Sequence, residues 1–378
     1  MPPPPATVLF VSSNGTGMGH LARLTAMARR SGDAVRPQFL SMSRAVPVVA
    51  ADVGAGGGAS GFAWEYVPSR DDLGIGPRRW NRQFQRRLTR VLLRDRPAAV
   101  VFDGTFPYDG LLAAIAEARE RRIDVRAVWS RRGMWRAGED GGQLSRSGRF
   151  DLVVEPGELA AEVDRGATAS RTDAVEVGPV TLLDADELLP RAEAAEALGV
   201  DPDRPTALLT LGAGNVRDLT GDRRLFLDRM LAVPGLQVVV THALIADQAD
   251  ELGDRVRATS VFPISRYFRA VDFAVSAAGY NSFHELVGFG VPTAFVPNPS
   301  MPLDDQPARA RWAAGSGAAL CLEDVTPDAV DEAVTLLADP EGRAALAARC
   351  REVARPNGAR DAMAAVEDVV AGVGFVEV

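Results

Sequence analysis

Short apolar runs alternate with helix-like patterns along the first half of the chain. Short apolar runs bounded by turn residues are typical of buried strands, and apolar residues recurring every three or four positions are typical of helices. The expected strands are 8–12, 37–41, 63–68, 98–102, 125–129 and 152–155; the expected helices are 21–30, 78–94 and 111–121, with a loop over 49–61. Strands that alternate with helices favour a doubly wound parallel sheet.

The second half repeats this alternation with a fresh start. Strands are expected at 206–211, 237–241, 270–276 and 293–296, and helices at 223–231, 282–288, 305–314, 340–348 and 360–371. A linker is expected near Gly178–Leu183. The predicted fold class is α/β, with two Rossmann-like domains that face one another across a cleft where a ligand would bind. The predicted domains are 1–180 and 181–355, followed by a closing C-terminal helix over 356–378.

The loop Asn14–His20 joins the first expected strand to the first expected helix. A glycine-rich turn at this place leaves backbone N–H groups unpaired at the helix N-terminus, which suits an anion. The loop ends in His20, whose imidazole can exchange a proton near pH 7. Asp103 ends a neighbouring strand, and we expect it to orient His20 or to bind the acceptor. The structural alternatives are a histidine that contacts phosphate or packs without moving a proton, and an aspartate that caps a turn.

Charge is distributed unevenly along a chain whose net charge is −8. Residues 1–180 contain 25 arginines against 20 acidic residues, which suggests different partners for the two halves; solubility or chance is the alternative. The helix expected at 78–94 carries an arginine stripe opposite Trp80 and Phe84. This stripe is either a solvated helix face or a surface for peripheral membrane contact.

The composition argues against other classes of partner. Nucleic acid is not expected, because the chain is acidic overall and contains no recognisable binding module. No signal peptide and no apolar run long enough for a membrane span is found. The expected location is therefore the cytoplasm, with the inner membrane surface as the alternative.

The segment Trp129–Arg136 ends a strand and enters a loop at the expected edge of the cleft. Arginines interleaved with tryptophans suit a phosphate or carboxylate beside an apolar or sugar face. We therefore predict that Arg131, Arg132 and Trp135 bind the acceptor. A structural loop is the alternative.

The segment Ser276–Pro292 resembles the nucleotide-sugar site of GT-B glycosyltransferases. It is most similar to the group that contains the N-acetylglucosaminyltransferase of peptidoglycan assembly and the plant monogalactosyldiacylglycerol synthases. The continuation from Phe295 to Gln306 and the opening loop Gly15–His20 fit the same pattern. The resemblance therefore covers both halves of the chain in the right order.

This resemblance implies a donor site. Glu285 would accept hydrogen bonds from both ribose hydroxyls of the nucleotide, which favours UDP or GDP over dTDP. The sugar would be held by Asp305 and Gln306, the base would lie near Phe262, and the diphosphate would be bound by Gly17, Gly19, Gly212, Gly214, Asn215, Gly279, Tyr280, Asn281 and Ser282. The structural alternatives are helix capping for Asn281, Ser282, Asp305 and Gln306, a helix-dipole contact for Glu285, and a tight turn for the glycines.

The resemblance also implies a reaction. His20 would act as the base in an inverting transfer from a UDP-sugar, the favoured donor, to a hydroxyl of a small-molecule or lipid-linked acceptor in an envelope glycan or natural product. Two helix N-termini would stabilise the diphosphate, so neither a metal nor a cofactor is expected. The segment Gly178–Leu182 lacks an arginine that the peptidoglycan enzyme carries. The alternatives are a nucleotide-sugar hydrolase like that of pseudaminic acid biosynthesis and a non-catalytic nucleotide-sugar-binding subunit.

Overall fold

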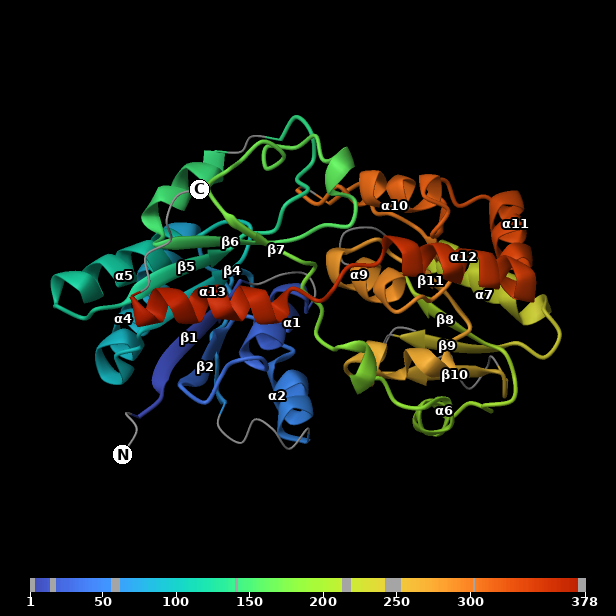
Figure 1. Ribbon diagram of the computed structural model, residues 1–378, viewed down its shortest axis with the longest axis horizontal. Helices are drawn as coiled ribbons and strands as arrows, with labels where there is room; N and C mark the ends of the chain where they lie inside the picture. The colour runs from blue at the N-terminus through green and yellow to red at the C-terminus, as the bar shows by residue number, and fades with distance from the viewer. Residues whose placement is uncertain are drawn as a thin grey trace.

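The structure, a computed structural model, describes residues 4–13, 18–55, 62–139, 142–212, 219–241, 253–301 and 303–372. Two parallel sheets lie side by side along the longest axis of the molecule (Figure 1). We call the first sheet with its helices the first domain, and the second sheet with its helices the second domain. The predicted α/β class with two Rossmann-like domains is confirmed.

The first sheet has the strand order β3-β2-β1-β4-β5-β6-β7. Its strands are β1 (Ala6–Ser12), β2 (Val35–Ser41), β3 (Ala63–Tyr66), β4 (Ala99–Asp103), β5 (Arg126–Ser130), β6 (Leu152–Pro156) and β7 (Val175–Val177). The accompanying helices are α1 (Gly19–Ala28), α2 (Val46–Ala55), α3 (Arg70–Leu73), α4 (Pro77–Asp95) and α5 (Asp109–Glu120), with 3₁₀ turns η1 (Gly142–Arg149) and η2 (Ala161–Val163). The loop predicted over 49–61 was wrong in part, because α2 runs to Ala55.

The second sheet has the strand order β10-β9-β8-β11-β12-β13. Its strands are β8 (Thr206–Thr210), β9 (Gln237–Thr241), β10 (Val256–Thr259), β11 (Phe273–Ser276), β12 (Thr293–Phe295) and β13 (Leu320–Cys321). The other elements are η3 (Ala185–Glu187), α6 (Arg191–Leu198), α7 (Thr220–Ala232), η5 (Ile264–Ala270), α9 (Tyr280–Gly288), α10 (Gln306–Gly315), α11 (Pro327–Ala338) and α12 (Pro340–Val353).

The C-terminal helix α13 (Ala359–Ala371) returns to the first domain. It packs against α1 and against β4 to β7, whereas α12 lies over the second domain (Figure 1). The chain therefore crosses between the domains twice, and the two crossings touch. The Gly358 N–H donates to Pro179 O at 2.9 Å, and a Cβ on Gly358 would lie 2.1 Å from Gly178 O. Only glycine fits so close an approach of two backbones.

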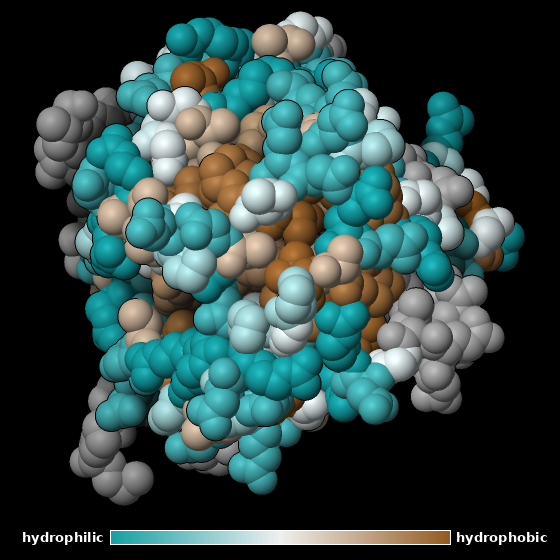
Figure 2. All heavy atoms as spheres, turned by 90° about the vertical axis from the view of Figure 1, so that its right-hand side faces the viewer, coloured by the Kyte–Doolittle hydropathy of each residue, from teal (hydrophilic) through white to brown (hydrophobic). Residues whose placement is uncertain are grey.

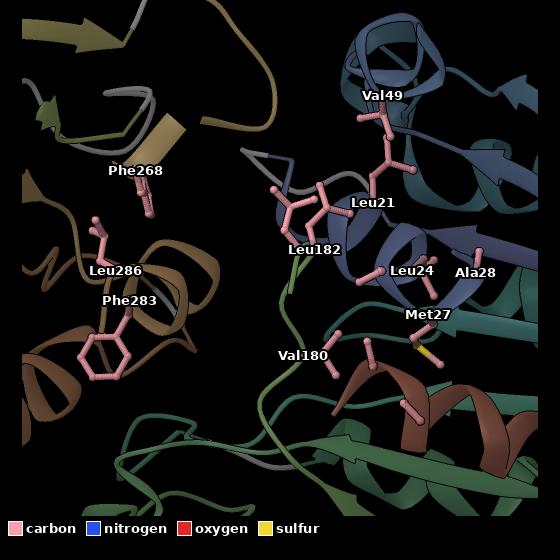
Figure 3. Packing of buried hydrophobic residues seen from close by; sticks show 14 of the residues in the cluster. Leu21, Leu24, Met27, Ala28, Val49, Val180, Leu182, Phe268, Phe283 and Leu286 are labelled. Atoms are coloured by element: carbon pink, nitrogen blue, oxygen red, sulfur yellow. The ribbon is translucent and has the colours of Figure 1, made fainter. Parts of the chain in front are cut away.

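One apolar core joins the two domains. Figure 3 shows Leu21, Leu24 and Met27 of α1 on one side of the linker residues Val180 and Leu182, with three residues of the second domain, Phe268, Phe283 and Leu286, on the other side. All of these side chains are buried. Burial of this apolar surface favours a fixed arrangement of the domains.

The arginine stripe of α4 lies on the surface. Trp80 and Phe84 are buried in the core of the first domain, so neither can insert into a membrane, and that part of the prediction does not fit the structure. None of the described helices is long and apolar enough to span a membrane.

Most of the exposed large apolar side chains belong to the first domain. Over the described ranges, Leu336 is the single example from the second domain, at 37% exposure. Figure 2 shows the end of the second domain, where apolar atoms lie between and beneath polar side chains. In the first domain, Met18 and Phe106 are 41% and 42% exposed, and both follow carboxyl ends of central strands. Both side chains therefore lie at the carboxyl edge of the first sheet, where the Arg146 guanidinium lies 4.3 Å from the centre of the Phe106 ring.

Candidate functional site

His20 and Asp103 form a hydrogen-bonded pair at the carboxyl edge of the first sheet. Strands β1 and β4 are neighbours, and Ser12 pairs with Asp103 in their register. His20 lies in the first turn of α1, which places its Nδ1 2.6 Å from Asp103 Oδ1. Asp103 is fully buried. The predicted pair is therefore brought together, with Nδ1–H donating to the carboxylate and Nε2 left for other chemistry.

The charge state of this pair suits a proton acceptor. Burial acts to raise the pKa of Asp103, but the nearby Arg23 and His20 outweigh it and bring the pKa to about 2. Burial lowers the pKa of His20 below its ordinary value, and the hydrogen bond to Asp103 offsets only part of this effect. At pH 7 the pair is therefore a neutral imidazole beside a carboxylate, which is the state a general base needs.

Two further side chains hold the Asp103 carboxylate. Arg23 donates from Nη2 to Oδ1 at 2.6 Å and from Nε to Oδ2 at 3.0 Å. The Ser130 hydroxyl at the end of β5 donates to Oδ2 at 2.8 Å. Sequence reasoning missed both residues. Because residues three apart are neighbours on a helix surface, the spacing from His20 to Arg23 was the available signal.

The N-terminus of α9 faces the N-terminus of α1 across the domain interface. Asn281 Nδ2 donates to Gly19 O at 3.4 Å, and Arg23 Nη1 donates to Asn281 Oδ1 at 3.3 Å. The N-cap residue of α9 is Gly279, and no side chain caps this helix. Two helix N-termini directed at one region attract an anion such as a diphosphate. Ser282 lies half-buried in the same first turn.

The Tyr280 side chain is engaged within the protein. Its hydroxyl accepts from the Val180 N–H at 3.0 Å and donates to Gly157 O at 2.9 Å, and its side chain is buried. Burial raises the pKa of this phenol above its ordinary value. The Tyr280 side chain therefore fixes the linker to the first domain, and it does not offer a diphosphate contact.

Glu285 lies one turn after Asn281 on the same face of α9. Burial raises the pKa of its carboxyl group to about 7, against the smaller opposing effects of the Leu182 N–H and the Ser265 hydroxyl. A carboxylate that is costly to ionise in the protein alone gains from two hydroxyl donors of a ligand. This environment suits the predicted ribose contact.

Replacing Glu285 with glutamine is expected to stabilise the free protein in alkaline solution. The folded-state pKa of Glu285 is raised from 4.5 to about 7, so its stability contribution is full below pH 4.5 and is lost as pH rises through 7. E285Q should therefore have a higher Tm than the wild type at pH 8 and a similar Tm at pH 4.5. A lower Tm for E285Q at pH 8 would contradict the assigned environment.

Asp305 and Gln306 are engaged within the protein. Asp305 caps α10, where its side chain accepts from the Ala308 N–H at 3.1 Å. Gln306 is buried; its Oε1 accepts from the Asn298 N–H at 3.0 Å, and its Nε2 donates to Asp304 at 3.1 Å. The same Nε2 lies beside Gly279 at the start of α9. The structural alternative therefore holds for Asp305, while Gln306 is placed at the edge of the predicted donor site.

Three of the remaining predicted donor residues lie outside the part of the chain that the structure describes: Gly17, Gly214 and Asn215. Gly212 follows β8 with a φ of +78°, a conformation that favours glycine, and its carbonyl accepts from Arg223. Phe262 is half-buried before η5 and packs against the core.

Arg131 and Trp135 do not fit the predicted acceptor site. Arg131 is fully buried, and its Nη2 lies 3.0 Å from Glu155 Oε2 and 2.9 Å from Asp173 Oδ1. The Trp135 side chain is also buried, and its indole N–H donates to Arg132 O at 2.9 Å. These two side chains stabilise the first domain, because a buried guanidinium and a buried indole both need internal partners.

Arg132 belongs to a buried ionic network between the domains. Its Nη1 lies 2.7 Å from Asp304 Oδ1, and Arg309 Nη1 lies 3.0 Å from the same atom. Arg309 Nη2 lies 2.6 Å from Glu158 Oε1, and His284 Nε2 lies 3.2 Å from Glu158 Oε2. Burial acts to raise the pKa of Glu158, but Arg309 and His284 bring it to about 2. The arginine predicted to bind the acceptor therefore ties the two domains together.

A cavity of about 180 Å³ lies at the domain crossings, away from His20 and Asp103. It is lined by linker residues, by one end of α9 and by the segment before α13, with Thr181, Leu183, His284, Phe289, Arg355 and Asn357 among its walls. None of the predicted site residues lines it. The candidate site therefore consists of the paired side chains and the helix N-termini at the interface.

Sequence comparison matches residues 242–365 to the glycosyltransferase family 28 C-terminal domain. Among curated proteins, the chain is 32% identical over 195 residues to the UDP-N-acetylglucosamine--N-acetylmuramyl-(pentapeptide) pyrophosphoryl-undecaprenol N-acetylglucosamine transferase of Clavibacter sepedonicus. That alignment covers 50% of this chain and 51% of the relative. The chain thus spans about half the length of the curated relatives it matches.

Solved glycosyltransferases share the fold over nearly the whole chain. The glycotransferase of kitacinnamycin has a TM-score of 0.64 at 18% identity, covering 97% of this chain and 100% of that chain. MurG of Acinetobacter baumannii has a TM-score of 0.61 at 18% identity, covering 96% and 100%. The resemblance predicted from the sequence is confirmed: the chain has the two-domain GT-B fold, and its residues 242–365 match the C-terminal domain of glycosyltransferase family 28.

Proposed function

We propose that this protein is a metal-independent, inverting glycosyltransferase that uses a UDP-sugar. The observation that carries the proposal is the position of His20, whose Nδ1 lies 2.6 Å from the buried Asp103 carboxylate beside the N-terminus of α9. A base oriented in this way and placed at an anion site matches what transfer from a diphosphate donor requires.

The second domain would bind the donor. Glu285 would accept hydrogen bonds from two vicinal ribose hydroxyls, which dTDP lacks. The N-termini of α9 and α1 would stabilise the leaving diphosphate through backbone N–H groups and helix dipoles. The curated relatives are named for transfer from UDP-N-acetylglucosamine, so this sugar nucleotide is the first donor to test.

The first domain would bind the acceptor. As the acceptor oxygen attacks the anomeric carbon, its proton passes to His20 Nε2, the bond from that carbon to the diphosphate breaks, and its electron pair leaves with the diphosphate. Attack on the face opposite the leaving group inverts the configuration. Asp103 stabilises the imidazolium that forms. The exposed Met18 and Phe106 replace Arg131 and Trp135 as candidates for an apolar contact with a lipid-linked or natural-product acceptor.

A binding screen followed by a turnover assay tests this function. UDP, GDP, dTDP and CMP are first added separately in a thermal-shift screen. Sugar nucleotides that contain the nucleotide with the largest rise in Tm are then tested for turnover. UDP is expected to raise Tm, and release of UDP from the sugar nucleotide is expected to depend on an added hydroxyl acceptor. Release of free sugar at full rate without an acceptor would indicate a hydrolase, and binding without turnover would indicate a non-catalytic subunit. A shift with dTDP alone would contradict the role of Glu285.

A further inference from the structure

Arg23 contacts both halves of the candidate site. Within the first domain, it binds both oxygens of Asp103, at 2.6 Å and 3.0 Å. Toward the second domain, its Nη1 donates to Asn281 Oδ1 at 3.3 Å, and its guanidinium lies 5.1 Å from the centre of the Tyr280 ring. The side chain is buried, so these contacts replace its solvation.

We propose that Arg23 is a positioning residue that couples the His20–Asp103 pair to the docking of the α9 N-terminus, so that the base is aligned when the donor-binding domain is in place. This inference rests on the proposed function of the pair as a general base. It assigns to Arg23 no contact with the reacting atoms.

The geometry explains how the coupling works. A guanidinium is planar and rigid, so the group that binds Asp103 from one edge fixes the direction of the N–H that reaches Asn281. Asn281 is held in turn by its Nδ2 contact with Gly19 O, one residue before His20. A displacement of α9 therefore moves a partner of Arg23 and a partner of the Gly19 backbone together. Lysine at position 23 would keep the charge but would lose this two-sided contact.

Titratable and charged groups of both domains face His20 and Arg23. His20 faces Asp103 at the end of β4, Arg23 on α1 and Arg132 after β5. Arg23 faces Asp103, and it also faces Tyr280 and Asp304 from the second domain. The positive charge of Arg23 lowers the pKa of both His20 and Asp103. Without Arg23, His20 is expected to keep its proton to a higher pH.

The experiment measures the titration of His20 by NMR, without any need for turnover. The full chain contains three histidines, so the His20 imidazole signals are assigned by comparison with His20→Gln. Arg23→Gln is expected to raise the pH midpoint of His20, whereas Arg23→Lys, which keeps the charge but removes the bridge to Asn281, should move the midpoint less, about as far as Asn281→Leu does. Arg29→Gln is the matched control, because Arg29 lies at the C-terminal end of α1 and pairs with Glu187. This substitution should leave the His20 midpoint unchanged.

A double-mutant cycle tests the coupling. Asn281→Leu alone is expected to move the His20 midpoint, and to move it much less when Arg23 is already glutamine or lysine, because both replacements remove the bridge. An unchanged or lower midpoint in R23Q, or equal effects of N281L in the presence and absence of Arg23, would overturn the proposal. If R23Q does not fold, the R23K and N281L pair decides the question alone.

The turnover readout separates this inference from the proposed function. For an active transferase, R23Q should lower kcat with little change in KM and move the acid limb of the kcat/KM profile to higher pH. R23K should recover most of this shift because it keeps the positive charge, a recovery that loss of packing alone would not produce. If no sugar nucleotide is turned over, the proposed function fails, while the NMR cycle still decides whether Arg23 couples the pair to α9.

Discussion

Replacing His20 with alanine is expected to lower kcat about 100-fold or more while leaving nucleotide affinity within about threefold. His20 Nε2 would receive the acceptor proton, and no other described imidazole lies at the Asp103 carboxylate, since His284 pairs with Glu158. The measurement is release of nucleoside diphosphate from the sugar nucleotide selected by the binding screen. H20A should fold normally, because the side chain is partly open to solvent.

The pH dependence of the wild type provides the matching control. Protonation of His20 removes the base, and burial lowers its pKa from the ordinary value of 6.5, so kcat/KM, which reports the free enzyme, should fall on the acid side with a midpoint below pH 6.5. H20A should lose this limb. Turnover of H20A within about threefold of the wild type would contradict the role of His20 as the base.

Replacing Arg309 with alanine is expected to destabilise the protein by about 3–5 kcal/mol. Arg309 is fully buried between Glu158 of the first domain and Asp304 of the second, with N–O distances of 2.6 Å and 3.0 Å. Its removal takes one cationic partner away from each of two buried carboxylates, those of Glu158 and Asp304. Urea unfolding, followed by fluorescence, measures the loss.

A neighbouring pair supplies the control for Arg309. Arg311 on the same helix pairs with Glu323 at 2.8 Å, but both side chains are exposed. R311A should therefore cost less than about 1 kcal/mol. Equal stability losses for R309A and R311A would show that the interdomain network does not hold the domains together as the structure indicates.

Most of the first sheet could be predicted from the sequence, because strands such as β1 and β4 are continuous apolar runs buried on both faces. The missed strands are short. β7 has three residues, none of them fully buried, β10 has four, of which only Val256 is fully buried, and β13 has only two, so none of the three carries a pattern long enough to predict a strand. Helix α2 was interpreted as a loop because glycine and alanine obscure its pattern, although Val49 and Val53 are buried in the core.

The chemistry of the site was predictable where a residue type has few uses, and not where partners are distant. A histidine at a helix start and an aspartate at a strand end predicted the His20–Asp103 pair. Arg131 was misread, because its partners Glu155 and Asp173 come from separate elements. The Glu158–Arg309 pair joins positions 151 residues apart, and local patterns carry no information on such a contact.

Titration calorimetry of UDP tests the central claim most directly, because it separates the donor site from the base. Three proteins are compared: the wild type, E285A and H20A. The account predicts that E285A weakens UDP binding about tenfold or more, because hydrogen bonds to a charged group contribute about 1.5–3 kcal/mol each, and that H20A binds UDP within about threefold of the wild type. Wild-type affinity in E285A, or loss of UDP binding in H20A, would contradict the account.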